Sequence, residues 1–312
     1  MNGQPAGRGG EVAWDGGAAA YLLGSVPMEK VTQPANPADP RTTSLRLTWL
    51  GHSSVVLDLD GVRLLTDPLL RRNAGPLRRR GRTPHASDWA DVDAVLLSHL
   101  HHDHAEVGSL RMLPELPIYT SVANAGWLHH KGLDGRGLHG GDWARVGDVG
   151  IRLTPADHHS RPMPHRPNDA NGHLVRGTRQ TVWAVGDTSL YAAMDQVPVW
   201  LGRPLDVILV PIGGWGPRLS TGHVGPDEAA EVCRRSGARY AVPVHYGTLH
   251  PPGMQWPEGA PPDRLRRGRR GGPAGLGWMD QPLERFREVL PRVAPGCELV
   301  SLAPGESWDL SV

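Results

Sequence analysis

Residues 98–104 carry a dense cluster of side chains that bind metals, with the sequence Ser-His-Leu-His-His-Asp-His. In an extended chain His99 and His101 project to the same side, so their imidazoles can share one ion. Asp103 and His104 lie beyond the bend and can reach a second ion. A cluster of surface histidines is the alternative explanation. Four donors within six positions, directly after an apolar run, favour a metal centre that activates water.

Single donors follow three further apolar runs. They are His158, Asp187 and His245. Alone, either histidine would be explained as an ordinary residue satisfied by hydrogen bonds, but together the three complete two coordination shells. Seven donors exceed what one tetrahedral zinc uses, so we expect two ions, most simply Zn²⁺, with Mn²⁺ or Fe²⁺ as alternatives. Because side chains alternate, the neighbouring His102 and His159 should point away from the ions.

Three more polar residues are candidates for supporting roles. Asp67 precedes a proline at a strand end, where it either orients a histidine ligand through a hydrogen bond or only makes a turn. His52 and His223 could contact a phosphate or a leaving group. His223 lies just before an expected helix start, a position that favours anions, and its alternative is a solvent-exposed loop histidine.

Apolar runs and turn residues indicate the elements that must position these donors. Continuous apolar runs predict strands buried on both faces at residues 92–97, 181–185, 207–210 and 240–244. Apolar periodicity predicts helices at residues 107–113, 121–129, 227–235 and 282–293. Nearer the N-terminus, Asp60-Gly61 separates two β-rich runs and predicts a tight hairpin. The order of these elements predicts a layered α/β protein in which helices cover the sheets.

The chain of 312 residues is long enough for one sizeable domain. Residues 1–42 are rich in Gly, Pro and Ala without periodicity, so we expect a disordered or loosely packed tail before a domain at 43–312. Two stretches rich in Arg and Pro, 71–88 and 251–280, are expected to be long loops that serve as lids or insertions.

Composition argues against several classes of protein. The net charge is +1 and the pI is about 8.0, so no global field indicates a partner such as nucleic acid. Cys233 and Cys297 are too few for a disulfide framework, and we expect both to be buried apolar residues. No apolar run reaches the roughly 20 residues of a membrane span, and the N-terminus lacks the pattern of a secretion signal. A cytoplasmic location is therefore expected.

The motifs together resemble the metallo-β-lactamase superfamily of metal-dependent hydrolases. The His-x-His-x-Asp-His motif, the later Gly-Asp-Thr and a late strand ending in histidine carry this resemblance. Further motifs are similar to the branch that contains ascorbate-phosphate lactonase and N-acylphosphatidylethanolamine-hydrolysing phospholipase D. They are Leu50-Gly51-His52-Ser53-Ser54, Thr66-Asp67-Pro68, Pro155-Ala156-Asp157-His158-His159-Ser160-Arg161, Pro211-Ile212-Gly213-Gly214 and Gly222 to Ala230. The resemblance covers about residues 44–250.

This resemblance implies an α/β fold of the four-layer αββα sandwich type, with the site along one edge. It implies that one metal is bound by His99, His101 and His158, the other by Asp103, His104 and His245, and that Asp187 bridges them. Two metals about 3.5–4 Å apart lower the pKa of a shared water, so the attacking group is hydroxide and no covalent serine or cysteine is needed. Asp103 and His223 are the residues expected to take part in catalysis.

The expected reaction is hydrolysis of an ester-type bond in a small molecule, either a phosphodiester or a lactone. The arginines at 71–82 and 264–270 could attract a phosphate-bearing substrate or membrane lipid headgroups, although solvated arginines explain them as well. No aromatic residues interleave with these runs, which argues against nucleic acid. The alternatives are a β-lactam or acyl amide hydrolase of the same superfamily and a metal-binding protein without catalysis. The sequence sets no expectation for the oligomeric state.

Overall fold

The computed structural model describes residues 45–159, 165–216, 218–252 and 279–310. These residues all belong to one compact unit. The expected tail at 1–42 and the arginines at 264–270 lie outside the described residues, as does most of the expected insertion at 251–280. Within the described ranges, no helix has the length and apolar character needed to cross a bilayer.

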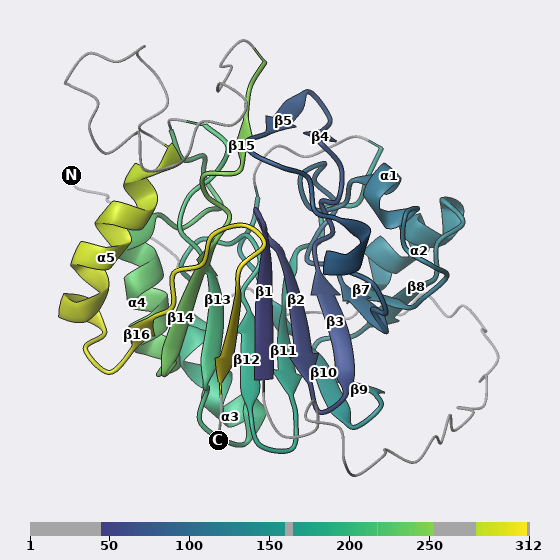
Figure 1. Ribbon diagram of the computed structural model, residues 1–312. Helices are drawn as coiled ribbons and strands as arrows, with labels where there is room; N and C mark the ends of the chain where they lie inside the picture. Colours follow the sequence, from purple (N-terminus) through teal and green to yellow (C-terminus); the bar gives the residue numbers. More distant parts are fainter. Residues whose placement is uncertain (1–44, 160–164, 217, 253–278, 311–312) are drawn as a thin grey trace, which may run out of the picture. The chain divides into compact units, whose positions relative to one another are not determined.

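Two sheets of seven strands each form the centre of the unit (Figure 1). The first has the order β17 (Ser307–Leu310), β1 (Leu45–Gly51), β2 (Ser54–Leu59), β3 (Val62–Thr66), β6 (Ala94–Leu96), β7 (Ile118–Ser121) and β8 (Gly135–Leu138). The second has the order β16 (Glu298–Leu299), β14 (Tyr240–Val244), β13 (Val207–Pro211), β12 (Thr181–Ala184), β11 (Asn171–Arg176), β10 (Val149–Pro155) and β9 (Trp143–Val146). Each sheet contains a block of parallel strands. In the first sheet these are β3, β6, β7 and β8, and in the second they are β12, β13, β14 and β16.

The first sheet is apolar on both faces. In β2, Leu57 shares a core with Trp183 of the second sheet, whereas the adjacent Val56 packs on the opposite face with Leu110 and Leu128. Those two leucines belong to α1 (Val107–Leu110) and α2 (Val122–His130). Because successive side chains of a strand point to opposite faces, this sheet requires both a second sheet and a helical layer to cover it.

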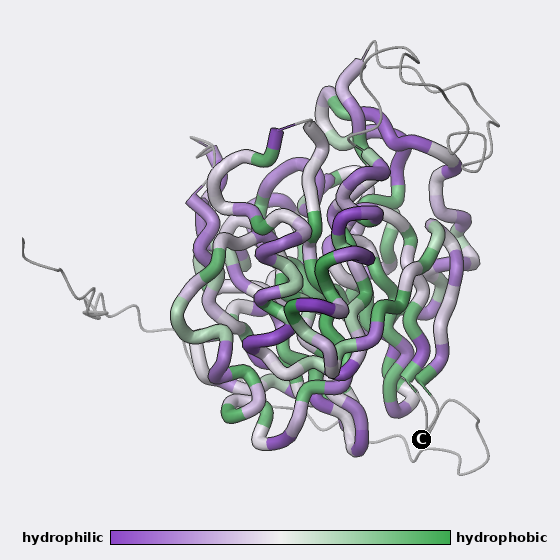
Figure 2. The backbone as a smooth tube through the Cα atoms, turned by 90° about the vertical axis from the view of Figure 1, so that its left-hand side faces the viewer, coloured by the Kyte–Doolittle hydropathy of each residue, from purple (hydrophilic) through white to green (hydrophobic). Residues whose placement is uncertain are grey.

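The second sheet is covered by a helical layer of its own. It consists of η3 (Ala192–Gln196), α3 (Val197–Leu201), α4 (Pro226–Ser236) and α5 (Gln281–Val293). Hydrophobic stretches consequently lie inside the molecule, and hydrophilic stretches lie toward its outside (Figure 2). The predicted four-layer αββα sandwich is confirmed.

Most predicted elements are present. The four predicted buried strands correspond to β6, β12, β13 and β14, and every residue of β13 is buried. The four predicted helices correspond to α1, α2, α4 and α5, although α1 ends at Leu110. Asp60 and Gly61 have φ angles of 51° and 77°, which is the backbone that a tight turn between β2 and β3 needs. The two cysteines are buried and free, as expected.

The stretch 71–88 is not the long loop or lid that its composition suggested. It contains β4 (Asn73–Ala74), β5 (Leu77–Arg79) and the 3₁₀ helix η2 (Ala86–Asp88), and β5 pairs with β15 (Leu249–His250) in a third, small sheet. The Arg79 guanidinium is buried and donates to the carbonyl of Leu50 at 2.8 Å and to the carbonyl of Leu69. Composition alone does not predict these strands for two reasons. One arginine of the run is buried and bonds backbone carbonyls, and the strand that pairs with β5 lies far along the chain.

Candidate metal centre

Strand ends bring the predicted ligands together in one cluster. His99 follows β6 of the first sheet, and His158 follows β10 of the second. Asp187 and His245 follow the parallel strands β12 and β14, whose carboxyl ends share an edge of the sheet, a usual place for ligand sites. His245 has a left-handed backbone with a φ of 60°, a strained conformation for histidine that is characteristic of functional sites.

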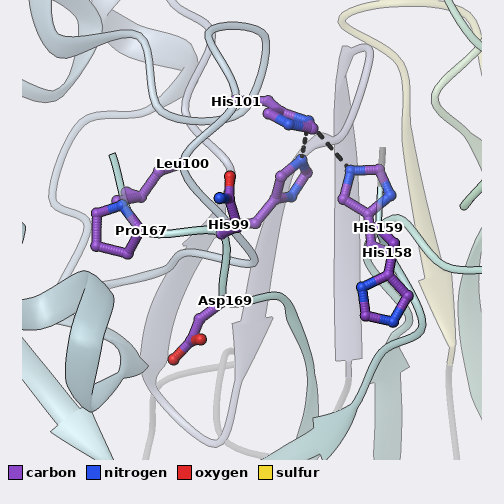
Figure 3. A pocket seen from close by; sticks show the side chains of 8 residues that line it. His99, Leu100, His101, His158, His159, Pro167 and Asp169 are labelled. Atoms are coloured by element: carbon purple, nitrogen blue, oxygen red, sulfur yellow. Dashed lines mark hydrogen bonds between the residues drawn. The ribbon is translucent and has the colours of Figure 1, made fainter. Parts of the chain in front are cut away.

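One group of donors consists of His99, His101 and His158. The Nε2 atoms of His99 and His158 lie 3.0 and 3.1 Å from Nδ1 of His101. Figure 3 shows these rings converging at one side of a pocket, with Leu100 and Pro167 at the other side. The donor atoms all lie within 4.8 Å of one another, a spacing that a single ion can bridge after small shifts.

A second group consists of Asp103, His104 and His245. Nε2 of His104 lies 3.1 Å from Nε2 of His245. Oδ2 of Asp103 lies 3.8 Å from the first of these nitrogens and 3.7 Å from the second. All three residues are buried. The structure thus separates the donors into the two groups that the resemblance implied, while their role as ligands stays a prediction.

Asp187 lies between the two groups. Its Oδ2 is 3.1 Å from Nε2 of both His104 and His245, and 3.8 Å from Nε2 of His99. Its Oδ1 is buried and has no hydrogen-bond partner among the described residues. Such an oxygen is costly in a protein interior, and a metal ion would remove that cost. The residues present therefore fit a pair of metal ions that share Asp187.

Hydrogen bonds on the outer side of the rings decide which nitrogen faces the centre. Nδ1 of His158 lies 2.7 Å from the carbonyl of Gly222, and Nδ1 of His245 lies 2.8 Å from the carbonyl of Gly213. A carbonyl only accepts, so each Nδ1 carries a proton, and Nε2 is the nitrogen that can offer a lone pair to a metal once the metal has displaced any second proton. Lone pairs that point at one another are the arrangement in which imidazoles bind a metal.

Asp67 orients one histidine of each group. Its Oδ2 lies 2.8 Å from Nδ1 of His104 and accepts from the hydroxyl of Ser98 at 2.7 Å. That hydroxyl lies 2.9 Å from Nδ1 of His99, and because it gives its own proton to Asp67 it accepts one from the ring. This geometry supports the orienting role for Asp67 over a plain turn role. Ser98 itself was not predicted; its position directly before the histidine motif was the only sign.

The buried carboxylates raise the affinity of the site for positive charge. Burial alone lowers the pKa of His104, but Asp187, Asp67 and Asp103 outweigh it and raise that pKa well above its ordinary value. Burial also lowers the pKa of His245, yet chiefly Asp187 raises it to about 9. The negative charge of these carboxylates must therefore be balanced by positive charge. Metal ions supply that charge when they replace the protons on the histidine rings.

His223 and His52 occupy different places around the centre. Nε2 of His223 lies 3.2 Å from Oδ2 of Asp187, so this side chain reaches the candidate bridge directly. His52 is only 1% exposed, and its Nε2 lies 3.1 Å from Oδ2 of Asp103. Burial lowers the pKa of His52 to about 4, which keeps the imidazole neutral. His52 is therefore enclosed in the interior, whereas His223 is partly exposed beside Asp187.

The two histidines that were expected to point away do so. His102 is exposed, and its Nδ1 lies 3.2 Å from a guanidinium nitrogen of Arg166. The His159 side chain is 93% exposed and lies at the edge of the pocket. Neither contributes to the donor groups of the described residues. Alternation along the chain was therefore a sufficient guide to their direction.

A pocket of about 200 Å³ opens beside the first group. It is lined by His99, Leu100, His101, His158, His159, Pro167, Asn168 and Asp169. Next to it, Arg166 donates to the carbonyls of Leu100 and Ala105 at 2.6 and 3.3 Å and lies 4.6 Å from the ring centre of Trp127. Arg166 thus ties the segment that lines the pocket to the metal-binding motif. No sequence pattern indicated this contact.

Known proteins match most of the described chain. The profile of the Beta-lactamase superfamily domain matches residues 62–246. A metal-dependent hydrolase from Methanoculleus marisnigri is 32% identical over 273 residues, which are 85% of this chain and 97% of that protein. N-acyl-phosphatidylethanolamine-hydrolyzing phospholipase D 1 from Caenorhabditis elegans is 29% identical over 231 residues, which are 66% of this chain. The match spans only 65% of the length of that phospholipase.

Solved structures share the fold. The metallo hydrolase Igni18 from Ignicoccus hospitalis superposes with a TM-score of 0.59 at 22% identity, over 86% of this chain and 100% of that one. An isothiocyanate hydrolase from Delia radicum gut bacteria gives a TM-score of 0.60 at 18% identity, with the same coverage of 86% and 100%. The chain therefore belongs to the metallo-β-lactamase superfamily. The relatives that it matches over most of their length are named metal-dependent hydrolases.

Proposed function

We propose that this protein is a dinuclear metal-dependent hydrolase that cleaves a phosphodiester or a lactone-type ester in a small molecule. The observation that carries the proposal is the position of Asp187 between two groups of buried donors, with one carboxylate oxygen left without a partner. Zn²⁺ is the simplest assignment for both ions, with Mn²⁺ or Fe²⁺ as alternatives. We also propose that the protein works in the cytoplasm.

The chain's own residues would hold the ions and move one proton. When bound, the metals lower the pKa of water and offset negative charge that develops on the substrate. Asp67 and Ser98 keep the lone pairs of His104 and His99 directed inward. His223 lies beside Asp187, where a protonated Nε2 can donate to the departing oxygen of the substrate. In this scheme Asp103 completes the second group of ligands.

A phosphate-bearing substrate is supported by the surroundings of His223. This residue lies just before α4, an 11-residue helix that begins at Pro226, and helix N-termini favour anions. The similar phospholipase is named for a phosphodiester substrate, N-acyl-phosphatidylethanolamine, which makes a membrane lipid the second candidate source of the same bond. A small pocket beside the first group suits the reacting end of such a molecule.

The described arginines of 71–82 add little to this argument. Arg79 is buried against carbonyl groups. Three others pair with carboxylates: Arg71 with Glu106 at 3.4 Å, Arg80 with Asp280 at 2.8 Å and Arg82 with Asp88 at 3.1 Å. These guanidinium groups are engaged within the protein, so the phosphate preference rests on the surroundings of His223.

Metal analysis combined with a substrate panel tests the proposal. Purified protein should contain two transition-metal ions per chain and should hydrolyse phosphodiesters or lactones faster than β-lactams, acyl amides or peptides. Metal at background level, in conditions that retain zinc in other proteins, would refute the dinuclear centre. Bound metal without turnover of any activated ester would favour a binding protein, and efficient β-lactam hydrolysis alone would overturn the substrate class.

A further inference from the structure

We propose that His52 is an eighth ligand, bound to the second metal together with Asp103, His104 and His245. The inference rests on the dinuclear centre of the proposed function and refines which metal each site prefers. With His52 included, the second site offers more donors than tetrahedral zinc uses. It should therefore suit the geometry of an ion that accepts five or six ligands, such as Mn²⁺ or Fe²⁺, better than the first site does.

The direction of approach distinguishes a ligand from a residue that only orients Asp103. Nε2 of His52 lies 3.1 Å from Oδ2 of Asp103. This is the same carboxylate oxygen that faces Nε2 of His104 and of His245. All four donor atoms lie within 4.8 Å of one another. A residue that only oriented the carboxylate would be expected on its other oxygen, away from the converging nitrogens.

The separations agree with shared coordination. Two ligands at right angles, each about 2.1 Å from an ion, lie about 3.0 Å apart. The observed separations are 3.1 Å between His52 and Asp103, 3.1 Å between His104 and His245, and 3.1 Å from Asp187 to each of the latter two. These four pairs are spaced as neighbouring ligands of one ion, and the longer separations of Asp103 from His104 and His245, 3.8 and 3.7 Å, are those of ligands at wider angles.

The backbone holds His52 at this position. Its carbonyl accepts from the backbone N–H of His245 at 3.0 Å and from the indole of Trp49 at 2.9 Å. Its own N–H donates to the hydroxyl of Thr248 at 2.7 Å. Its φ is 53°, a left-handed conformation that strains a residue other than glycine and that must be stabilised by its surroundings. The chain therefore maintains a strained backbone that places a buried imidazole beside the second group.

The number of donors makes the two sites unequal. The first site has His99, His101 and His158 with a share of Asp187, which is four protein ligands and suits tetrahedral zinc. The second site has His52, Asp103, His104 and His245 with a share of Asp187. These are five protein ligands, and they would leave one position of an octahedron open. Imidazole and carboxylate ligands in such numbers suit Mn²⁺ and Fe²⁺.

A glutamine substitution tests the proposal in the full-length protein. In His52→Gln the side-chain amide keeps an N–H that can bond Asp103 but removes the imidazole. The matched control is His173→Gln, because His173 is equally buried at 2% exposure, contacts the carbonyl of Tyr119 at 3.1 Å and belongs to no donor group of the described residues. Metal-free protein is equilibrated with Zn²⁺ or Mn²⁺, and bound metal is measured by elemental analysis.

We expect His52→Gln to retain one ion and to bind the other more weakly by at least the roughly 10–100-fold that loss of a ligand's outer hydrogen-bond partner costs, with the larger loss for Mn²⁺. The control should bind both ions as the unmodified protein does. With Co²⁺ as a probe, loss of a ligand should intensify the visible absorption of one ion, because absorption strengthens as the coordination number falls. Unchanged binding, or weaker binding with an unchanged Co²⁺ spectrum, would overturn the proposal.

Two further outcomes keep the tests separate. If the unmodified protein binds no metal, the proposed function fails rather than this refinement of it. If His52→Gln does not fold, X-ray absorption of the unmodified protein with Mn²⁺ in the second site decides the matter. Three imidazoles around manganese would support His52 as a ligand, and two would exclude it.

Discussion

Nε2 of His223 lies 3.2 Å from Oδ2 of Asp187, the carboxylate between the two donor groups. On the other side of the ring, Nδ1 of His223 lies 3.2 Å from the carbonyl of Ser220 and 3.3 Å from that of Thr221. The two carbonyls therefore hold the ring so that Nε2 is directed toward the proposed metals. Because one residue is assigned to proton transfer and the other to metal binding, their substitutions should have different effects.

His223→Ala should slow substrates with poor leaving groups far more than substrates with good ones. A general acid contributes about 10²–10⁴-fold, and it matters most when the departing oxygen is basic. The measurement is kcat for a series of phosphodiesters that differ in leaving-group pKa, with metal content determined in parallel. His129→Ala, which alters an exposed histidine of α2 outside the pocket lining, is the control. Equal losses across the series would assign His223 to substrate binding instead.

Asp187→Ala should abolish turnover and weaken both metals while the chain remains folded. The carboxylate lies 3.1 Å from donors of the second group and 3.8 Å from one donor of the first, and it belongs to no strand. Elemental analysis and activity should fall together, and circular dichroism should not change. Activity close to that of the unmodified protein would show that the assignment of Asp187 as the bridge is wrong.

Asp103→Ala and His102→Ala should differ sharply although the residues are adjacent. Asp103 is buried, and imidazoles including His104, His245 and His52 hold the pKa of its carboxyl well below the ordinary value, even though burial alone raises it. Its loss should remove the second metal and nearly all turnover. His102 is exposed and bonded to Arg166, so its loss should be mild. Similar effects for the two would indicate a surface histidine cluster without defined ligands.

Asp67→Asn should weaken metal binding without any change to a predicted ligand. An amide nitrogen in place of Oδ2 would donate to Nδ1 of His104, so the ring proton would move to Nε2 and block coordination. Losses of about 10–100-fold in metal affinity are typical when such a partner is removed. Competition against a chelator provides the measurement, with Asp93→Asn, at a carboxylate that accepts from the Arg63 N–H, as the control. Wild-type affinity in Asp67→Asn would return Asp67 to a turn role.

Arg79→Met should destabilise the fold by about 2 kcal/mol, because the carbonyls of Leu50 and Leu69 lose a charged donor. Burial lowers the pKa of Arg79 only to about 10, so the guanidinium is charged at neutral pH. Urea unfolding of this variant and of Arg78→Met provides the comparison. Arg78 neighbours it in β5 but is exposed, and its replacement should change stability by less than about 0.5 kcal/mol. Equal effects would mean that Arg79 contributes no more than a surface arginine.

Sequence alone determined the ligand types and most of the elements that carry them. Local patterns predict β13 because a continuous apolar run suits a strand buried on both faces, and they predict α4 because Pro226 and two acidic residues suit its first turn. Alternation along the chain separates His101 from His102. These inferences succeed because each depends on neighbouring residues, whose relative directions follow from backbone geometry.

Only the tertiary structure decided which distant residues meet. Local patterns do not predict β11, because Asn171 and His173 are polar and become acceptable in a strand only when partners such as the carbonyl of Tyr119 bond them. The contacts of His52 with Asp103 and of Asp67 with Ser98 depend on strand order and on left-handed turns that no local pattern specifies. Ligand identity is thus local information, whereas the number of ligands around each metal depends on how the sheets bring separate turns together.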